Sequence, residues 1–491
     1  MRKVFSACTL MFTCFLTAQV TEVNETVTPG KIKSHISFIA SDELRGRDTG
    51  SPEIDIAAQY IASRLLEYGI DPIDSSQGYF QQVPLKAVSA PKSGVIATPE
   101  TSLAIGSDAL LMDGSDGYWK TSSVFVNYGM PKDFEKSDVS GKVVVAICGS
   151  KTERDPRKWL KLSREKRALA QQLGAVGLIE LYNSPQIPWV LLVPYLSNDK
   201  ILIDEAKPDQ SEPLLTLWVN DGGNDKVSLF QGSLIEIKIE GTATRKFQGK
   251  NVVGISRGTD PKLKDEYVLF GAHYDHVGVG QPDSDGDSIY NGSRDNAVGT
   301  VTVLSMAEHL AKYPAKRSAL FVFFTAEEKG LLGSKFFSDH SIIPLEKIVY
   351  CFNSDGAGYN DTSVATIIGL ERTTAKADIV EACETYELKA IEDPAPEQGL
   401  FDRSDNVSFA KKGIPAPTFS LGLTSFNEEI NKYYHQPADN PESLDYDYLL
   451  RFFRAYVLAG KKIANSESRQ FWIKGDKYFE AGEKLYGLKN Q

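Results

Sequence analysis

The sequence predicts an α/β fold, in which a mostly parallel central sheet carries helices on both faces and is interrupted by a smaller, β-rich inserted domain. Two observations predict the sheet. Residues 267–271 (YVLFG) and 319–325 (ALFVFFT) are nearly continuous apolar runs, which is typical of strands buried on both faces. Amphipathic stretches of helical period lie between such runs, as they do in strand–helix–strand units.

The first residues have the features of a secretory signal peptide. Basic residues at positions 2 and 3 precede an apolar run over 4–16, and small residues follow, so we expect cleavage after Ala18. The run is short for a membrane span, and a retained anchor is the alternative. We therefore expect a secreted or periplasmic protein whose mature chain has no membrane span.

The rest of the chain divides into three segments. Residues 32–68 have a helical pattern and open the first part of the main domain, expected over 19–105. The inserted domain is expected over 106–245, with strands at 142–147, 177–181, 214–219 and 234–239 and a helix at 158–173. The main domain resumes over 246–491, with strands at 267–271, 319–325, 347–352, 365–368 and 416–420 and a helix at 297–313.

Composition excludes several classes of function. With 54 basic against 65 acidic residues, the net charge of −11 gives no reason to bind nucleic-acid phosphates. Neither of the common nucleotide-binding glycine motifs occurs. Beyond the signal peptide only Cys148, Cys351 and Cys383 remain, without a CxxC pair, so a metal would have to be held by His, Asp and Glu.

Ionisable side chains follow three of the predicted strands directly. In α/β sheets the carboxyl ends of the strands are where sites form, and a charge buried there needs a partner. A divalent metal suits several carboxylates and a few imidazoles together. The candidates are His273 and Asp275 after the first strand, Glu327 and Glu328 after the second, Asp355 after the third, Asp295 before the helix at 297–313, and His435 in a late loop.

Five of these residues are expected metal ligands: His273, Asp295, Glu328, Asp355 and His435. Imidazole and carboxylate without thiolate suit catalytic zinc. Five side chains are too many for one tetrahedral ion that keeps a water, but they suit two ions if one carboxylate bridges. Three carboxylates and two zinc ions leave a charge of about +1, which favours bound hydroxide at neutral pH.

Two neighbouring carboxylates are expected to assist. Successive residues at a strand end point in different directions, so Glu327 can face the water while Glu328 ligates, and Glu327 would act as general base. Asp275 could accept the second ring N–H of His273. Asp283, Asp285 and Asp287 resemble a calcium loop, but their spacing does not fit an EF-hand, and a surface loop is the favoured interpretation.

These positions resemble the motifs of the M28 family of zinc aminopeptidases. The resemblance covers about 30–90 and 247–460, and it implies a zinc-exopeptidase (phosphorylase/hydrolase-like) fold. Its motifs are GAHYDHVG (271–278), SRDNAVG (293–299), FFTAEEKGLLGS (323–334), NSDGAG (353–358) and YYHQPADNPESLD (433–445). It implies that His273 and Glu328 hold one zinc, that Asp355 and His435 hold the other, and that Asp295 bridges. It also implies Glu327 as general base and Asp275 as the carboxylate behind a ligand.

Two residues depart from the family pattern. Asn296 stands where many members have a second acid, and Asn406 stands where many have a histidine that is not a metal ligand. The first leaves the ligands intact, and the second concerns substrate contacts.

The segment 106–245 resembles a protease-associated (PA) domain through VSGKVVVAICGS (139–150) and LGAVGLIELYNS (173–184).

The expected function is that of an exported aminopeptidase with two Zn²⁺ per chain. It would remove N-terminal residues from peptides with a free N-terminus, with a zinc-bridging hydroxide as nucleophile and Glu327 as base. One alternative is a glutaminyl cyclase-like acyltransferase with a single zinc. The other is a non-catalytic binding protein on the same scaffold.

Overall fold

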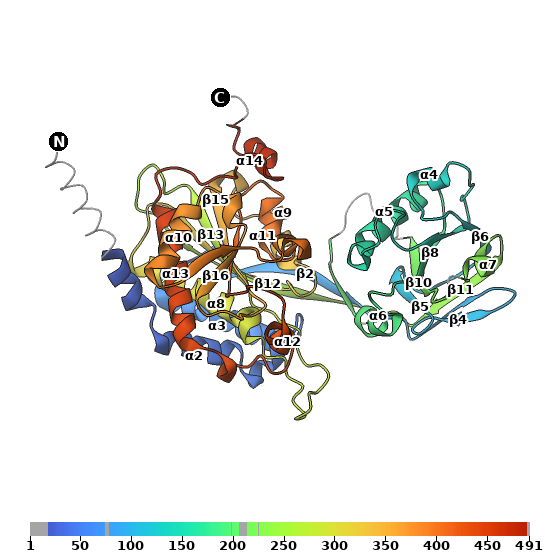
Figure 1. Ribbon diagram of the computed structural model, residues 1–491, viewed down its shortest axis with the longest axis horizontal. Coiled ribbons are helices and arrows are strands. Elements are labelled where there is room, and N and C mark those ends of the chain that lie inside the picture. Colours follow the sequence, from blue (N-terminus) through green and yellow to red (C-terminus); the bar gives the residue numbers. More distant parts are fainter. Residues whose placement is uncertain (1–17, 74–77, 198, 206–213, 224, 489–491) are drawn as a thin grey trace. The chain divides into compact units, whose positions relative to one another are not determined.

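The computed structural model describes residues 18–73, 78–197, 199–205, 214–223 and 225–488. Residues 1–17 of the expected signal peptide lie outside the described residues, so its cleavage stays a prediction. The chain forms two compact units (Figure 1). We call Met1–Pro84 with Gln248–Gln491 the main unit, and Leu85–Phe247 the inserted unit.

Within the described residues, the sheet that runs through the main unit has ten strands of mixed direction. They are β1 (Asp71–Pro72), β2 (Phe80–Val88), β9 (Lys200–Ile203), β12 (Thr244–Ser256), β13 (Tyr267–His273), β14 (Ser318–Phe324), β15 (Ile348–Ser354), β16 (Val364–Ile368), β17 (Lys389–Glu392) and β18 (Thr418–Ser420). The order is β17-β16-β18-β15-β13-β14-β12-β2-β9, and β1 pairs with β12. β13 lies between β14 and β15 and is parallel to both, which confirms the predicted parallel centre.

Helices cover both faces of this sheet. They are α2 (Pro29–Ile39), α3 (Pro52–Tyr68), α8 (Val298–Lys312), α9 (Leu332–Asp339), α10 (Lys376–Thr385), α11 (Asn406–Ala410), α12 (Glu428–Tyr433), α13 (Tyr446–Asn465) and α14 (Phe479–Leu485). Along β13, Val268, Phe270 and Ala272 join a cluster with residues of α2, α3, α8 and α13, whereas Tyr267 and Leu269 join a cluster with residues of α9 and α11. The two-residue period of the strand therefore supplies two cores, which explains its continuous apolar sequence.

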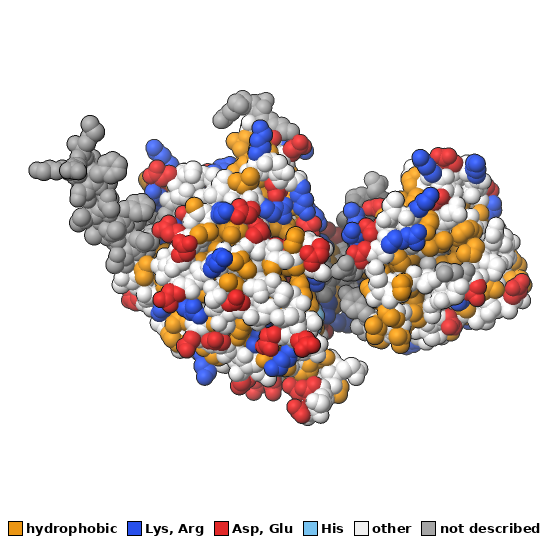
Figure 2. Space-filling model, viewed as in Figure 1, with side chains coloured by type: hydrophobic (Ala, Val, Ile, Leu, Met, Phe, Trp, Pro, Cys, Tyr) orange, Lys and Arg blue, Asp and Glu red, His pale blue; other side chains and the backbone are white. Residues whose placement is uncertain are grey.

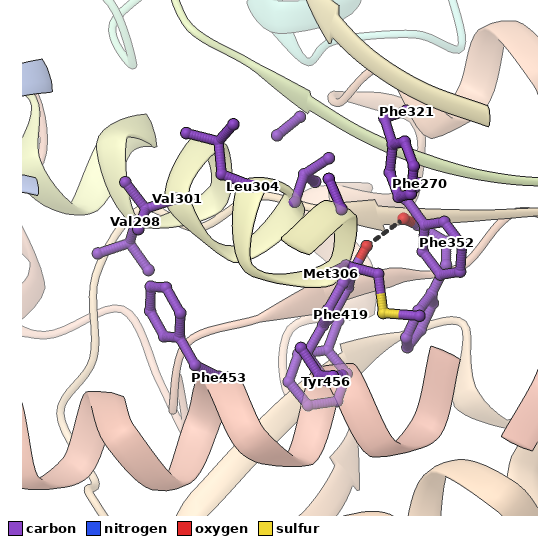
Figure 3. Packing of buried hydrophobic residues seen from close by; sticks show 14 of the residues in the cluster. Phe270, Val298, Val301, Leu304, Met306, Phe321, Phe352, Phe419, Phe453 and Tyr456 are labelled. Atoms are coloured by element: carbon purple, nitrogen blue, oxygen red, sulfur yellow. Dashed lines mark hydrogen bonds between the residues drawn. The ribbon is translucent and has the colours of Figure 1, made fainter. Parts of the chain in front are cut away.

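The larger cluster fixes α13 to the sheet (Figure 3). The ring of Tyr456 in α13 stacks on that of Phe352 in β15, with centroids 4.6 Å apart. The Tyr456 hydroxyl donates to the Phe352 carbonyl at 2.7 Å, which gives this buried polar group the partner it needs. β15 is the strand that leads to Asp355, so this packing holds one wall of the candidate site.

The part of the inserted unit that the structure describes has a sheet of its own with eight strands, in the order β4-β3-β11-β6-β7-β8-β10-β5. Its strands are β3 (Ser93–Ala97), β4 (Ser102–Ala104), β5 (Ala109–Asp113), β6 (Gly117–Phe125), β7 (Val143–Ile147), β8 (Gly177–Tyr182), β10 (Leu215–Asn220) and β11 (Leu234–Glu240). Its helices are α4 (Pro131–Phe134), α5 (Trp159–Gln172), α6 (Trp189–Leu196) and α7 (Val227–Phe230). The strands and helix predicted for this segment are thus present.

The inserted unit begins earlier than the boundary expected at 106. β3 pairs antiparallel with β11, and β4 pairs with β3, so residues 93–104 belong to this sheet. The sequence obscured this because Pro91, Gly94 and Pro99 interrupt the strand pattern there. The end of the unit at Phe247 lies close to the expected end at 245.

The inserted unit contains a buried ion pair and an exposed apolar helix. The Lys166 ammonium lies 2.8 Å from a Glu180 oxygen, and both side chains are 1% exposed. The other Glu180 oxygen accepts from the Trp218 indole N–H at 3.0 Å, so this buried carboxylate is fully partnered.

On α6, Val190 and Leu191 are exposed, and apolar atoms gather there in Figure 2.

Acidic and basic side chains are interspersed over the face of the main unit seen in Figure 2. Among the described residues, no helix combines the length and the apolar character that a membrane crossing requires. Cys148, Cys351 and Cys383 are free, buried thiols.

Candidate metal centre

The ends of the central strands bring the predicted residues together in two adjoining groups. One group contains His273, Glu327 and Asp355, and the other contains His276, Asp295, Glu328 and His435. In each group, one potential ligand atom from every residue lies within 4.8 Å of the others. All five expected ligands and the expected base are therefore present in the centre, and His276 is an addition.

Asp295 connects the two groups. Its Oδ1 lies 3.3 Å from His273 Nε2, and its Oδ2 lies 3.1 Å from His435 Nε2. One carboxylate thus directs an oxygen toward each group, which is the arrangement of a bridging ligand. Gly292 makes this approach possible, because a Cβ at this position would lie 2.3 Å from the Asp295 carbonyl oxygen.

The expected pairing of the other ligands is wrong. His273 Nε2 lies 3.3 Å from Asp355 Oδ1, and His435 Nε2 lies 3.2 Å from Glu328 Oε1. His273 therefore groups with Asp355, and Glu328 groups with His435. The cause is the turn after β14, where Ala326 has a left-handed φ of 56° and the next two side chains diverge. Glu327 turns toward the His273 group, and Glu328 turns toward the His435 group.

The expected contact of Asp275 also needs correction. The His273 Nδ1 lies 3.2 Å from the backbone carbonyl oxygen of Asp275 and 3.7 Å from its carboxylate. The carboxylate instead accepts the backbone N–H groups of Glu327 at 3.0 Å and Glu328 at 3.2 Å, and the Thr49 hydroxyl at 3.2 Å. Asp275 therefore orients the backbone of the base and of a ligand.

The charges of the centre fit a bound cation. Burial alone lowers the pKa of His435, but hydrogen bonds to Asp295 and Glu328 raise it to about 10. Burial likewise opposes protonation of His273, yet Glu327 and Asp355 raise its pKa well above the ordinary value. The carboxylates thus draw protons onto the imidazoles. A metal ion can take the place of these protons, because metal binding to imidazole releases them.

Glu327 has the environment of a proton acceptor. Burial raises its pKa well above the ordinary value, and Glu328 and Asp355 add to the rise. A carboxyl group of raised pKa beside a metal ligand set is suited to general acid–base chemistry near neutral pH.

Residues 251–459 match peptidase family M28. This segment, which contains the candidate metal centre, is therefore similar to that peptidase family. The chain is 29% identical over 324 residues to the aminopeptidase YwaD of Bacillus subtilis, covering 65% of this chain and 62% of the relative. It is 27% identical over 247 residues to the probable leucine aminopeptidase 2 of Aspergillus oryzae, covering 44% of this chain and 45% of the relative. The matches thus span less than two thirds of either relative.

Solved structures agree on the fold. The aminopeptidase from Aneurinibacillus sp. strain AM-1 superposes with a TM-score of 0.61 at 17% identity, over 92% of this chain and 97% of that one. BSAP, a zinc aminopeptidase from Bacillus subtilis, superposes with a TM-score of 0.50 at 20% identity and the same coverage. The α/β architecture predicted from the sequence is therefore confirmed, and it is the fold of these two aminopeptidases.

Two buried residues of the candidate metal centre were not predicted from the sequence. His276 is fully buried, and its Nδ1 lies 2.9 Å from Glu328 Oε1. The sequence feature that could have indicated His276 is the segment HYDH, in which it is the second histidine after a predicted strand. Asp405 is also fully buried, and burial raises its pKa to about 7, with His273 nearby opposing the rise. Asp405 lies in the segment that resembles the M28 family (247–460), but the sequence predicted no function for this residue.

A buried arginine joins the segments that carry the ligands. Arg47 has polar neighbours in the sequence, yet its side chain is entirely buried at the end of the 3-10 segment Asp42–Arg47. Its guanidinium donates to the carbonyls of Tyr274 at 2.8 Å, Asn291 at 2.6 Å and Gly292 at 3.0 Å. Burial lowers the Arg47 pKa to about 10, so the group stays charged and fixes both segments.

A second arginine fixes Asp295 relative to the loop of His435. Arg294 donates to Asp439 at 2.8 Å, and the other Asp439 oxygen accepts the backbone N–H of Arg294 at 2.9 Å. The guanidinium lies 3.7 Å from the ring centroid of Tyr433. This buried pair couples the two loops that supply Asp295 and His435.

The two departures from the M28 pattern have structural roles. The Asn296 amide donates to the Ser354 carbonyl at 3.0 Å, and its oxygen accepts the N–H of Gly299 at 3.0 Å. It thereby ties the Asp295 segment to β15. Asn406 is fully buried and donates to the Ala416 carbonyl at 3.0 Å.

The acidic loop at 283–287 is explained by its own turn. An oxygen of Asp283 accepts the backbone N–H groups of Asp285 at 2.9 Å and Asp287 at 3.0 Å. The three side chains are exposed, in line with the surface loop expected there.

Proposed function

We propose that the protein is a di-zinc aminopeptidase that hydrolyses N-terminal residues from peptides. The observation that carries this proposal is the Asp295 carboxylate, which directs one oxygen to His273 and the other to His435. Five ligand side chains that include one shared carboxylate suit two ions. Glu327 lies within the His273 group, where an acid–base residue is needed.

The donor set fits zinc. His273 and Asp355 would hold one ion, Glu328 and His435 the other, and Asp295 both. Imidazole and carboxylate donors without thiolate are typical of catalytic zinc. When bound, zinc polarises the scissile carbonyl and makes water acidic enough to lose a proton near neutral pH.

The residues of the chain handle the proton. Glu327 would accept it from the attacking water at a carboxylate oxygen and deliver it to the nitrogen of the leaving amine. Asp275 positions Glu327 by accepting its backbone N–H. The net reaction adds water across the first peptide bond and releases a free amino acid and a shortened peptide.

The class of substrate is inferred from the relatives. Those reported above are named as aminopeptidases, one of them as a probable leucine aminopeptidase. We infer peptides with a free N-terminus as substrates. The inserted unit is proposed to be a PA-like domain, and the chain is proposed to be exported after removal of residues 1–18.

The proposal is tested with a panel of aminoacyl and dipeptide substrates, together with metal analysis. We expect close to two zinc ions per chain, release of free amino acids, and loss of activity with a chelator that zinc restores. A single zinc with cyclisation of N-terminal glutamine would favour the glutaminyl cyclase alternative. Intact peptides in the presence of zinc would favour a binding protein and overturn the proposal.

A further inference from the structure

His276 lies inside one of the two groups of ligands. Its side chain is fully buried, and its Nδ1 lies 2.9 Å from Glu328 Oε1. The same Glu328 oxygen lies 3.2 Å from His435 Nε2, which in turn lies 3.1 Å from Asp295 Oδ2. Four potential ligand atoms from four residues thus gather within 4.8 Å of one another.

The position of His276 is fixed by backbone. Its N–H donates to the Arg47 carbonyl at 3.2 Å. A Cβ on Gly292 would lie 2.5 Å from Cγ of the imidazole, so the ring packs directly on glycine backbone. Its ring meets that of His435 edge to face, with centroids 5.2 Å apart and planes at 82°. The imidazole is therefore held in place beside the ligand atoms before any ion binds.

The two groups differ in the number of donors they offer. The group of His276, Asp295, Glu328 and His435 offers two imidazoles and two carboxylates. These four donors would be electrically neutral together with one divalent zinc ion, and four side-chain ligands are the number found in a closed tetrahedral zinc site. The His273 group offers His273, Asp355 and the shared Asp295. It retains open positions for water and substrate.

We propose that His276 is a fourth side-chain ligand of the zinc ion held by Asp295, Glu328 and His435. This inference rests on the proposed di-zinc function. It makes the two metal positions unequal. The position with His276 binds its ion more tightly and fills first, and the His273 position exchanges its ion more readily.

The test uses the variant His276→Asn. Asparagine keeps an N–H donor near the place of Nδ1, so it can preserve the hydrogen bond to Glu328, but it has no imidazole lone pair for zinc. The matched control is His309→Asn, which removes a buried histidine whose Nδ1 lies 3.0 Å from the Thr26 hydroxyl. Circular dichroism shows whether each variant is folded.

Zinc titration of the metal-free full chain gives the first result. We expect two zinc-binding steps in the wild type and in H309N. In H276N we expect the zinc affinity of the tighter step to fall about 100-fold. Loss of a residue that only supports a ligand costs at most about this much. In the cobalt form we expect weaker d–d absorption and a changed spectrum for H276N. Unchanged affinities, or weaker binding with an unchanged spectrum, would overturn ligation by His276.

A measurement on the wild type keeps the proposal testable if H276N does not fold. In protein carrying ¹⁵N-histidine and ¹¹³Cd, three imidazoles should show coupling to cadmium. Coupling of two imidazoles would refute the His276 assignment. If the wild type binds two ions and cleaves peptides, and H276N binds zinc as the wild type does, only this inference is refuted. If the wild type binds no second ion or cleaves no peptide, the proposed function is refuted.

Discussion

Buried acids in the two units are neutralised in different ways. In the inserted unit, Glu180 is paired with the ammonium group of Lys166 and with the Trp218 indole. In the main unit, Asp295 and Glu328 are paired with imidazoles, whose protons a metal ion can replace. In the first arrangement, side chains of the protein satisfy the carboxylate fully, so its role is structural. The second is exchangeable, and this difference marks the main unit as the place of chemistry.

The largest expected effect tests the chemical side of this comparison. Glu327→Gln removes the proton acceptor but keeps the size and shape of the side chain. We expect kcat to fall by about 10²–10⁴-fold, the usual contribution of a general base, with zinc content unchanged. Steady-state kinetics with metal analysis measures both. Activity close to that of the wild type would exclude Glu327 as the base.

The structural side is tested by Lys166→Met. The change leaves Glu180 buried without its cation, which should lower the free energy of unfolding by about 3–5 kcal/mol. Denaturant unfolding of the full chain measures it. Lys161→Met, on the exposed face of the same helix, is the control and should stay within about 0.5 kcal/mol of the wild type. Equal effects of the two substitutions would contradict the assignment.

A third prediction concerns a buried histidine of the main unit outside the metal centre. Burial lowers the pKa of His309 to about 3, whereas the unfolded chain takes up this proton near 6.5. The stability that neutral His309 contributes is therefore present above pH 6.5 and is lost as the pH falls. Between pH 7 and 4.5, wild-type stability should fall about 2–3 kcal/mol more than that of His309→Asn. Parallel pH profiles of the two proteins would refute this.

The smallest expected effect is that of Asp275→Asn. The amide keeps one acceptor oxygen, so one of the backbone N–H groups of Glu327 and Glu328 loses its partner. We expect a 10–100-fold loss of zinc affinity or kcat/KM, as for other residues that orient ligands. Thr49→Val, which removes only the hydroxyl bond to the same carboxylate, should cost less. A larger loss for T49V would rule out this role for Asp275.

The sequence predicted the central strands and the candidate site residues that follow them because the same physical rule governs both. A strand buried on both faces is apolar throughout, so the first charged residue after it, such as Glu327 after β14, stands out. The pairing of ligands could not be read in this way. It depends on the direction of the chain at Ala326, where a left-handed turn separates two adjacent glutamates.

Other features depend on distant contacts that leave little trace in the sequence. Arg47 has the polar neighbours of a surface loop, yet it is buried because carbonyls from residues 274, 291 and 292 receive its N–H groups. His276 adjoins a predicted ligand, but its approach to Glu328 requires the glycine at 292. The start of the inserted unit was misplaced because β3 pairs with β11 at the far end of that unit.

The bonds of Arg47 also constrain how the protein is made. Three of the carbonyls it binds, those of Tyr274, Asn291 and Gly292, are synthesised more than two hundred residues later, after the whole inserted unit. During translation the N-terminal helices must therefore wait for their partners, while the inserted segment has its full sheet available and can fold as a unit of its own. A complete set of candidate ligands is thus among the last features that the newly made polypeptide acquires.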